Sequence, residues 1–458
     1  MRTLIVNGLV VTPDGEIAAG LLIEQGKIAG ILAHGAQLPA VDEVIDASGL
    51  VVMPGAIDVH THFTGSHDFP EQELREGTQG AAAHGVTTIV EMPHSLPPAT
   101  TTGNFIAKRE MLARSCTTDF AMWAGLDGNN LAQLAEMHEA GAIAFKAFLC
   151  SGAPDGGATD EKGLPRLNDD ALLRAMRELA TFDGLIGVHA ENHDILLGAG
   201  GELRAAGRKD TRAHALAGPE IAEIEAVGRV LQIARETGAR AHIVHVSSAQ
   251  AAQLIAAARP AVRVTFETCP HYLMLDEDDL VRIGPNARCG PPIRPRAVVD
   301  ALWQVLESGE IDILASDHCP YTPEQKLAGL ESIWDAGMGL TGVETLGPMF
   351  FSEGHVKRGL PLKELARMTA SGPAQAFHLW PQKGAIALGA DADLAFYDPE
   401  ASWTVTGENF HGLGKWSAFE GMHCQGKVVR TLIRGITVFR DGEMQVAPGF
   451  GQFLTRSH

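Results

Sequence analysis

The chain has 458 residues, of which 45% are hydrophobic and 20% charged, so it can fill a large core and is not a disordered chain. Its formal net charge of −20 argues against a nucleic-acid backbone or an anionic membrane surface as a partner. At about 150 residues per domain, this length fits two or three domains or one large α/β barrel with an attachment. We therefore expect a small, neutral or modestly charged molecule as the partner.

The cysteines and the first residues of the chain indicate the cellular compartment of the protein. The six cysteines form no CxxC pair and no spacing typical of a disulfide framework; they are Cys116, Cys150, Cys269, Cys289, Cys319 and Cys424. The first 16 residues show no basic region followed by an apolar stretch and a cleavage site, and no run of 18 apolar residues occurs. We expect a cytoplasmic protein without export signal or membrane span.

The two ends of the chain are predicted to share one small sheet. Residues 3–16 alternate apolar residues around turn residues, and the pattern resumes at 21–32, as in β-hairpins. Residues 431–443 repeat the layout of 3–16, with the same Thr-Leu-Ile start and Asp-Gly-Glu end. Chance likeness is the alternative, because turns reuse the same residue types. We assign residues 1–50 and 386–458 to a small β-sandwich domain.

Between these ends, short β-branched or apolar runs alternate with helix-length amphipathic stretches, which is the pattern of parallel βα units. Eight runs are strand candidates: 56–63, 87–93, 119–126, 142–149, 185–192, 241–248, 262–270 and 311–320. Helices fit the intervening positions, among them 171–182, 220–238 and 297–309. Because eight such units close into a (β/α)₈ barrel, we predict an α/β fold with a TIM barrel over residues 51–385.

Candidate metal ligands stand at the ends of five of these strands, where the active site of such a barrel lies. Strand 56–63 carries His60 and His62, whose side chains share one face because successive residues alternate sides. The other four strands contribute Lys146, His189, His245 and Asp317. One such histidine is usually a packed core residue, but four imidazoles and a carboxylate at equivalent depth predict a metal site.

Lys146 requires a separate explanation, because an ammonium cannot ligate a cation and is costly to bury beside metal ions. A neutral lysine amine captures CO₂ to form a carbamate, which presents two oxygens and a negative charge and can bridge two divalent ions. Two alternatives remain, a lysine whose amine reaches solvent and a one-metal deaminase site with an unmodified Lys146. We expect two ions and a carbamate.

Two ions about 3.5 to 4 Å apart activate a shared water near neutral pH. Asp317 would bind one ion, accept a proton during attack on an amide carbonyl and return it to the leaving nitrogen. No serine or cysteine nucleophile is then required, although Cys319 is the residue to weigh for that role. His318 points to the opposite face by strand alternation and is left out of the ligand set.

The segments that carry these residues resemble the signature segments of the amidohydrolase superfamily, and in particular the cyclic amidohydrolases. They are GAIDVHTHF (55–63), GAIAFKAFL (141–149), VHAEN (188–192), IVHVSS (243–248) and SDHCP (316–320), and the likeness extends to GFGQFLTR at 449–456. The resemblance implies the same six ligands, zinc as the usual ion with manganese or cobalt as alternatives, and a homodimer or homotetramer.

Departures from the family patterns separate its members. Dihydroorotases resemble HxHxR, but Thr64 stands at the place of the arginine. Where allantoinases and dihydroorotases tend to carry asparagine after Met-Pro, this chain has His94, and where D-hydantoinases and dihydropyrimidinases place a tyrosine it has Ser151. The Glu91-Met92-Pro93 segment and the tail look most like L-hydantoinases, which lie close to allantoinases.

The resemblance therefore implies hydrolytic opening of a cyclic ureide or imide of the hydantoinase or allantoinase type. Dihydroorotase or dihydropyrimidinase activity is the alternative reading. A catalytically inactive scaffold paralogue is a second alternative, which the complete ligand set disfavours.

Substrate recognition in this family relies largely on backbone groups, which implies contacts at Gly290 and at Met338-Gly339. The side chains expected to line the pocket are His94, Ser151 and Phe69, together with His67, Cys150 and Trp334. His271 either reaches the site or has a structural role.

Overall fold

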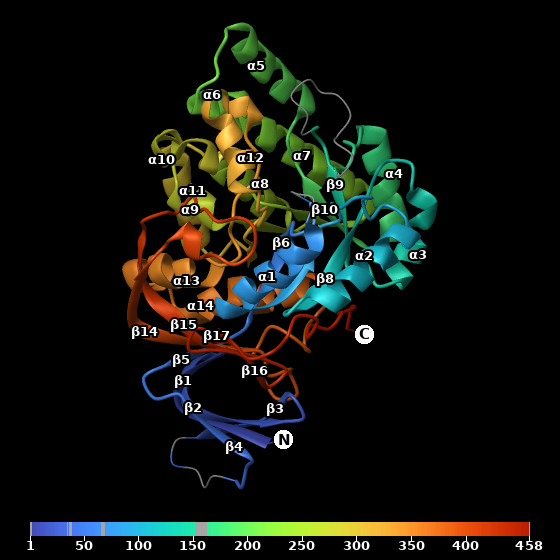
Figure 1. Ribbon diagram of the computed structural model, residues 1–458. Coiled ribbons are helices and arrows are strands. Elements are labelled where there is room, and N and C mark those ends of the chain that lie inside the picture. The colour runs from blue at the N-terminus through green and yellow to red at the C-terminus, as the bar shows by residue number, and fades with distance from the viewer. Residues whose placement is uncertain (1, 34, 36–38, 66–68, 152–162, 458) are drawn as a thin grey trace.

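The computed structural model describes residues 2–33, 35, 39–65, 69–151 and 163–457, so His67 lies outside the described residues. Figure 1 shows a barrel surrounded by helices, with a sheet made from both ends of the chain on one side of it. Among the described residues, no helix is long and apolar enough to cross a bilayer.

All eight predicted barrel strands are confirmed. They pair in parallel in chain order, as β6 (Ala56–Thr61), β7 (Val86–Glu91), β8 (Asp119–Gly125), β9 (Ala144–Phe148), β10 (Leu185–His189), β11 (Arg240–Ile243), β12 (Val264–Thr268) and β13 (Ile313–Leu314). A parallel bridge between Thr61 and His318 joins the segment after β13 to β6, and the His62 amide donates to the His318 carbonyl at 2.7 Å. The barrel is thereby closed beside the predicted ligands.

Helices surround the barrel, and several of them, such as those at Asp169–Ala180 and Arg296–Glu307, bury one apolar face. Their bounds are α1 (Pro70–Ala83), α2 (Thr102–Ser115), α3 (Leu134–Glu139), α4 (Asp169–Ala180), α5 (His193–Ala205), α6 (Thr211–Ala217), α7 (Glu220–Thr237), α8 (Ala249–Ala258), α9 (Pro270–Met274), α10 (Glu277–Ile283), α11 (Arg296–Glu307), α12 (Pro323–Leu327), α13 (Leu346–Phe350), α14 (Leu362–Ala366) and α15 (Gly372–Ala376). Short 3₁₀ or π segments accompany them at Leu131–Gln133, Gly284–Ala287, Ala328–Leu330, Ile333–Asp335, Phe351–Val356, Arg367–Ser371 and Gly407–Asn409. The three helices expected at 171–182, 220–238 and 297–309 are α4, α7 and α11.

The two chain ends share one sheet, as their repeated pattern predicts. Its order is β17-β16-β15-β14-β5-β1-β2-β3, with β4 paired to β1. The strands are β1 (Arg2–Thr12), β2 (Gly15–Glu24), β3 (Lys27–Ala33), β4 (Glu43–Asp46), β5 (Val51–Pro54), β14 (Leu394–Thr404), β15 (His423–Ile433), β16 (Ile436–Arg440) and β17 (Glu443–Met444). Ile5 and Leu21 share a buried cluster with Phe396 and Leu432, so the sheet folds around its own core in the manner of a sandwich.

A buried ionic cluster ties this sheet to the barrel. Lys383, whose side chain is 1% exposed, has its Nζ 2.6 Å from Asp119, 2.7 Å from Asp393 and 3.1 Å from Asp391. Asp119 begins β8, whereas Asp393 immediately precedes β14. The cluster therefore lies at the amino end of β8, at the opposite end of the strand from the predicted active site.

Lys383→Met is expected to lower the free energy of unfolding by about 3–5 kcal/mol, because it removes the cation from among three largely buried carboxylates. Lys27 contacts Asp391 from a half-exposed position, so Lys27→Met is the matched control and should cost no more than about 1 kcal/mol. Urea unfolding of both variants measures the difference. Equal losses would contradict the role assigned to Lys383.

Candidate metal centre and active site

Two imidazoles and a carboxylate converge where β6 and β13 end. The Nε2 atoms of His60 and His62 are 3.1 Å apart, and Asp317 Oδ1 lies 3.1 Å from the first and 3.3 Å from the second. Neutral imidazole nitrogens and carboxylate oxygens offer lone pairs to one another at these distances. Such a group is stable only around a proton or a cation, and N and O donors of this kind suit zinc and similar divalent ions.

The other two predicted histidines stand beside this pair, His245 within the same group of ligand atoms and His189 in a neighbouring group with Cys150 and Glu191. The His245 ring lies 4.5 Å from the His189 ring and 5.2 Å from the His60 ring, between centroids. His60, His245 and Asp317 each offer a ligand atom within 4.8 Å of the others. Within the described residues, His245 Nδ1 is buried and has no hydrogen-bond partner, so it is a donor atom left free for a ligand role.

Lys146 lies within β9 as a fully buried lysine. Among the described residues its Nζ has no hydrogen-bond partner, and it stands 4.8 Å from the centroid of the Phe148 ring. Burial lowers the pKa of Lys146 to about 8, although Asp317 and Glu267 act in the opposite direction. The amine therefore loses its proton more readily than an exposed lysine does, as capture of CO₂ requires.

The backbone at two of the predicted ligands departs from the expected strands. β11 ends at Ile243 and β13 at Leu314, whereas the sequence predicted extended runs through 248 and 320. His245 and Asp317 have φ values of +40° and +49°, in the left-handed region that non-glycine residues rarely adopt. Strand alternation therefore does not place these two side chains. A strained turn directs them, and such strain is common at functional sites.

Carboxylates that sequence reasoning did not select hold the histidines in place. Glu267 contacts His60 Nδ1, accepts from His242 Nε2 at 3.0 Å and accepts from the His245 amide at 3.2 Å. Burial alone would raise the pKa of Glu267, but the two imidazoles bring it below its usual range. Carboxylates behind metal-binding histidines fix the tautomer and the ring orientation.

A second carboxylate, that of Glu191, contacts His189 as Glu267 contacts His60. Glu191 Oε2 lies 2.7 Å from His189 Nε2, and Cys150 is also hydrogen-bonded to this imidazole. Both carboxylates were detectable in principle, because Glu267 lies within a predicted strand and Glu191 follows His189 by two residues, at a strand end.

The loop after β6 is held by a buried ion pair that was also missed. Glu91 accepts hydrogen bonds from Thr61 Oγ1 at 2.9 Å and from the Thr64 amide at 3.0 Å. Lys108 Nζ lies 3.5 Å from Glu91 and donates to the carbonyl of His94 at 2.7 Å. This pair fixes the segment after His62 relative to the segment after β7.

Three of the five predicted substrate contacts lie near each other or near the ligands. The His94 ring is 4.8 Å from the His62 ring. A Cβ atom added to Gly290 would meet Met338 Sδ at 3.3 Å, so these two positions face each other across neighbouring loops. Phe69 is 62% exposed just before α1, and the Ser151 amide donates to His193 Nδ1 at 3.3 Å.

The other two described residues expected to line the pocket, Cys150 and Trp334, contact different parts of the protein. Cys150 offers its sulfur within 4.8 Å of ligand atoms of His189 and Glu191. Trp334 Nε1 donates to the Arg208 carbonyl at 2.9 Å.

The histidines outside the ligand set differ in their partners. His271 is buried, and within the described residues its Nε2 has no partner. His318 Nδ1 accepts from the Gly342 amide at 3.1 Å, so this ring is engaged away from the ligand cluster.

Comparisons with known proteins agree with the geometry. The model of the amidohydrolase family matches residues 51–438. The chain is 36% identical to L-hydantoinase of Paenarthrobacter aurescens over 99% of this chain and 98% of that protein, and 38% identical to allantoinase of Rubrobacter xylanophilus over 98% and 97%.

Solved structures give the same result. The structure of L-hydantoinase (dihydropyrimidinase) from Arthrobacter aurescens has a TM-score of 0.94 at 36% identity, covering 99% of both chains. Dihydropyrimidinase from Brevibacillus agri has a TM-score of 0.90 at 31% identity, covering 100% of this chain and 99% of the other. With a family match over most of its length and relatives of this identity, the chain belongs to the amidohydrolase family.

Proposed function

We propose that this protein is a metal-dependent cyclic amidohydrolase that opens the amide bond of a cyclic ureide or imide, of the hydantoinase or allantoinase type. The observation that carries the proposal is the convergence of His60, His62 and Asp317 within 3.3 Å, in a barrel whose neighbouring strand holds the unpartnered amine of Lys146. The names of the most similar relatives support the substrate class.

The chemistry of these residues fits a pair of divalent ions. We assign the ligands as His60, His62, Lys146 as its carbamate, His189, His245 and Asp317. Zinc is the proposed ion, with manganese or cobalt as alternatives, because imidazole and carboxylate donors suit all three. When bound, the ions would polarise the amide carbonyl and make a water acidic enough to react near neutral pH.

The side chains of the protein perform the remaining steps. Asp317 accepts the proton of the attacking water at its carboxylate and delivers it to the ring nitrogen that leaves. Glu267 and Glu191 hold the rings of His60 and His189 in the orientations in which they would bind the ions. The main chain at Gly290 and Met338 would hold the ring, and His94, Ser151 and Phe69 are the proposed walls.

A turnover screen tests the substrate class directly. We expect ring opening of hydantoin, a 5-substituted hydantoin of one hand, or allantoin, because Thr64 and Ser151 replace the residues typical of the other members. Preferred turnover of dihydroorotate or dihydrouracil would support the alternative activities. An absence of turnover with all of these rings, in metal-loaded protein, would support the inactive scaffold and contradict the proposal.

Removal of the metal is expected to abolish turnover. Dialysis against a chelator should lower the metal content and the activity in parallel, because the carbonyl and the water both lose their activating charge. Adding Zn²⁺, Mn²⁺ or Co²⁺ should restore both, as measured by elemental analysis and initial rates. Full activity in protein shown to be free of metal would contradict the prediction.

We place the enzyme in the cytoplasm as a homodimer or homotetramer. All six cysteines are free in the structure, which suits a reducing compartment. The net charge of −20 supports a small-molecule substrate over nucleic acid or an anionic membrane surface.

A further inference from the structure

Lys326 is a fully buried lysine on α12 whose amine faces main-chain oxygens. Its Nζ donates to the carbonyls of Arg288 at 3.1 Å, Gly337 at 2.8 Å and Gly339 at 2.9 Å. An ammonium has three N–H donors, so this geometry uses all of them. The Trp416 ring covers the same amine, with its centroid 4.8 Å from Nζ.

The three carbonyls belong to two loops that contribute to the proposed substrate pocket. Arg288 precedes Gly290, and Gly337 and Gly339 flank Met338, the two positions that face each other. The Gly339 amide also donates to the Arg288 carbonyl at 3.1 Å. Lys326 therefore joins the loops 288–290 and 337–339 at the point where they meet.

The guanidinium of Arg288 strengthens the same connection. Its Nη1 donates to the carbonyl of Trp334 at 3.0 Å and also contacts the carbonyl of Ala336. Two buried cations thus bind carbonyls of the same segment, Arg288 those of residues 334 and 336 and Lys326 those of residues 337 and 339.

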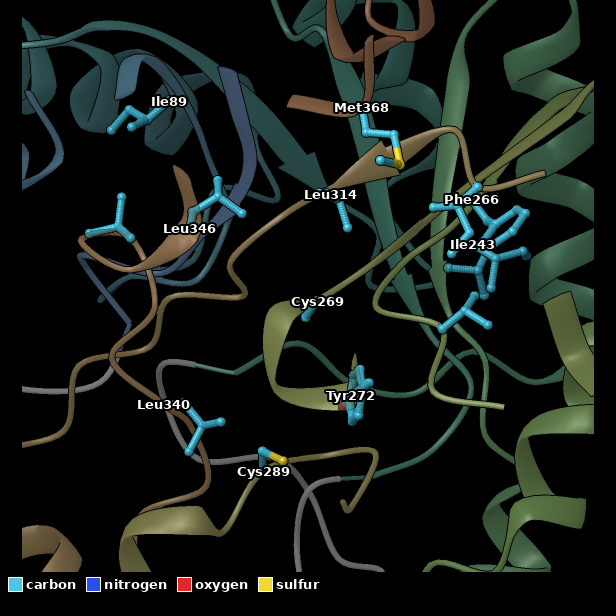
Figure 2. Close-up of a cluster of buried hydrophobic side chains, with 14 of the residues drawn as sticks. Ile89, Ile243, Phe266, Cys269, Tyr272, Cys289, Leu314, Leu340, Leu346 and Met368 are labelled. Atoms are coloured by element: carbon cyan, nitrogen blue, oxygen red, sulfur yellow. The ribbon is translucent and has the colours of Figure 1, made fainter. Parts of the chain in front are cut away.

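The loop 337–339 also packs directly against the segment that carries Asp317. Leu340 forms a parallel bridge with His318, and the Cys319 amide donates to the Leu340 carbonyl at 2.7 Å. A Cβ atom at Gly339 would lie 2.5 Å from Cys319 Cβ, so the two segments are too close for a side chain at this position. Figure 2 shows Cys289 and Leu340 within one buried cluster with Leu314 of β13.

Burying a lysine in this way is costly, and burial lowers the pKa of Lys326 to about 7. An apolar side chain would avoid that cost but would take this donor from the carbonyls of Gly337 and Gly339. Proteins depart from the usual rules of core composition chiefly at functional sites. The energetic cost of burying Lys326 is explained if the lysine holds the two loops at a fixed spacing.

We infer that Lys326 is a positioning residue that fixes the backbone of loops 288–290 and 337–339 at the spacing at which they bind the ring of the substrate. The inference rests on the proposed function. It assigns Lys326 no contact with the substrate or with the ions. Its loss should therefore weaken substrate binding more than it slows the chemical step.

The test compares Lys326→Met, Lys326→Gln and wild type, each loaded with zinc. We expect KM to rise about tenfold in Lys326→Met while kcat stays within about threefold and the metal content is unchanged. Lys326→Gln keeps two N–H donors and should give an intermediate KM. In Lys326→Ala, methylammonium should lower KM again, whereas tetramethylammonium, which has no N–H donor, should not.

Ile255→Ala on α8 is the matched control, because it removes buried volume away from both loops and lowers stability. It should leave KM unchanged. The positioning role is wrong if KM is the same in Lys326→Met and wild type. It is also wrong if KM rises as much in Ile255→Ala as in Lys326→Met, or if methylammonium does not change the KM of Lys326→Ala. If the wild type opens none of the rings, the proposed function fails and the inference fails with it; if only the variants behave unexpectedly, the inference alone fails.

Discussion

Asp317→Asn is expected to lower kcat by about 100- to 10,000-fold, the range typical of a lost general acid–base group. An amide cannot accept the proton of the attacking water, and it is also a weaker ligand than a carboxylate. The fold should survive, because the replacement keeps the size of the side chain. Initial rates on the ring that the wild type prefers, together with metal content and a thermal melt, measure the effect.

Asp312→Asn is the matched control on the same segment. Asp312 pairs with Arg259 at 2.7 Å and accepts a hydrogen bond from the Phe266 amide at 2.9 Å. It precedes β13 in the chain, whereas Asp317 follows that strand. It should change stability slightly and kcat hardly at all. A kcat in Asp317→Asn within about tenfold of wild type, with full metal content, would remove Asp317 from the proton-transfer role.

The barrel and the strand-end positions of the candidate ligands were predictable from the sequence, because both follow from short-range patterns. Buried parallel strands are continuous apolar runs, and the carboxyl ends of barrel strands meet on one face. A histidine or aspartate at such an end interrupts the apolar pattern and is easily seen. His60, Lys146 and His189 were placed correctly in or at the end of a strand by this argument alone.

The backbone conformation and the contacts that orient these side chains were not predictable from short-range sequence patterns. The left-handed backbone at His245 and Asp317 depends on tertiary packing, since neither residue is a glycine. Glu267 reaches histidines 25 and 207 residues away in sequence, and Lys326 binds carbonyls up to 38 residues away. The sequence can single out a buried acid such as Glu267 within a predicted strand, but it does not show which residues such a group contacts.

Lys146→Met is expected to reduce the bound metal and to bring turnover below detection. Methionine keeps the length and the apolar stem of lysine but cannot form a carbamate, so the proposed ligand and its negative charge would be lost. In wild type, apo-protein incubated with Zn²⁺ should regain metal and activity faster when bicarbonate is added, because CO₂ must react with the buried amine first. Intact mass under gentle conditions should show one added CO₂ on wild type and none on Lys146→Met.

Lys108→Met is the matched control for this experiment. Lys108 is also buried, and burial lowers its pKa to about 8 as well, but its amine is engaged by Glu91 and by the His94 carbonyl. Its replacement should disturb the loop after β7 and leave the bicarbonate dependence of metal uptake intact, since the reacting amine is still present. Two results would show that the centre forms without a carbamate: metal uptake in wild type that does not depend on bicarbonate, or a full complement of metal in Lys146→Met. Either result would favour a single-ion site with an unmodified lysine.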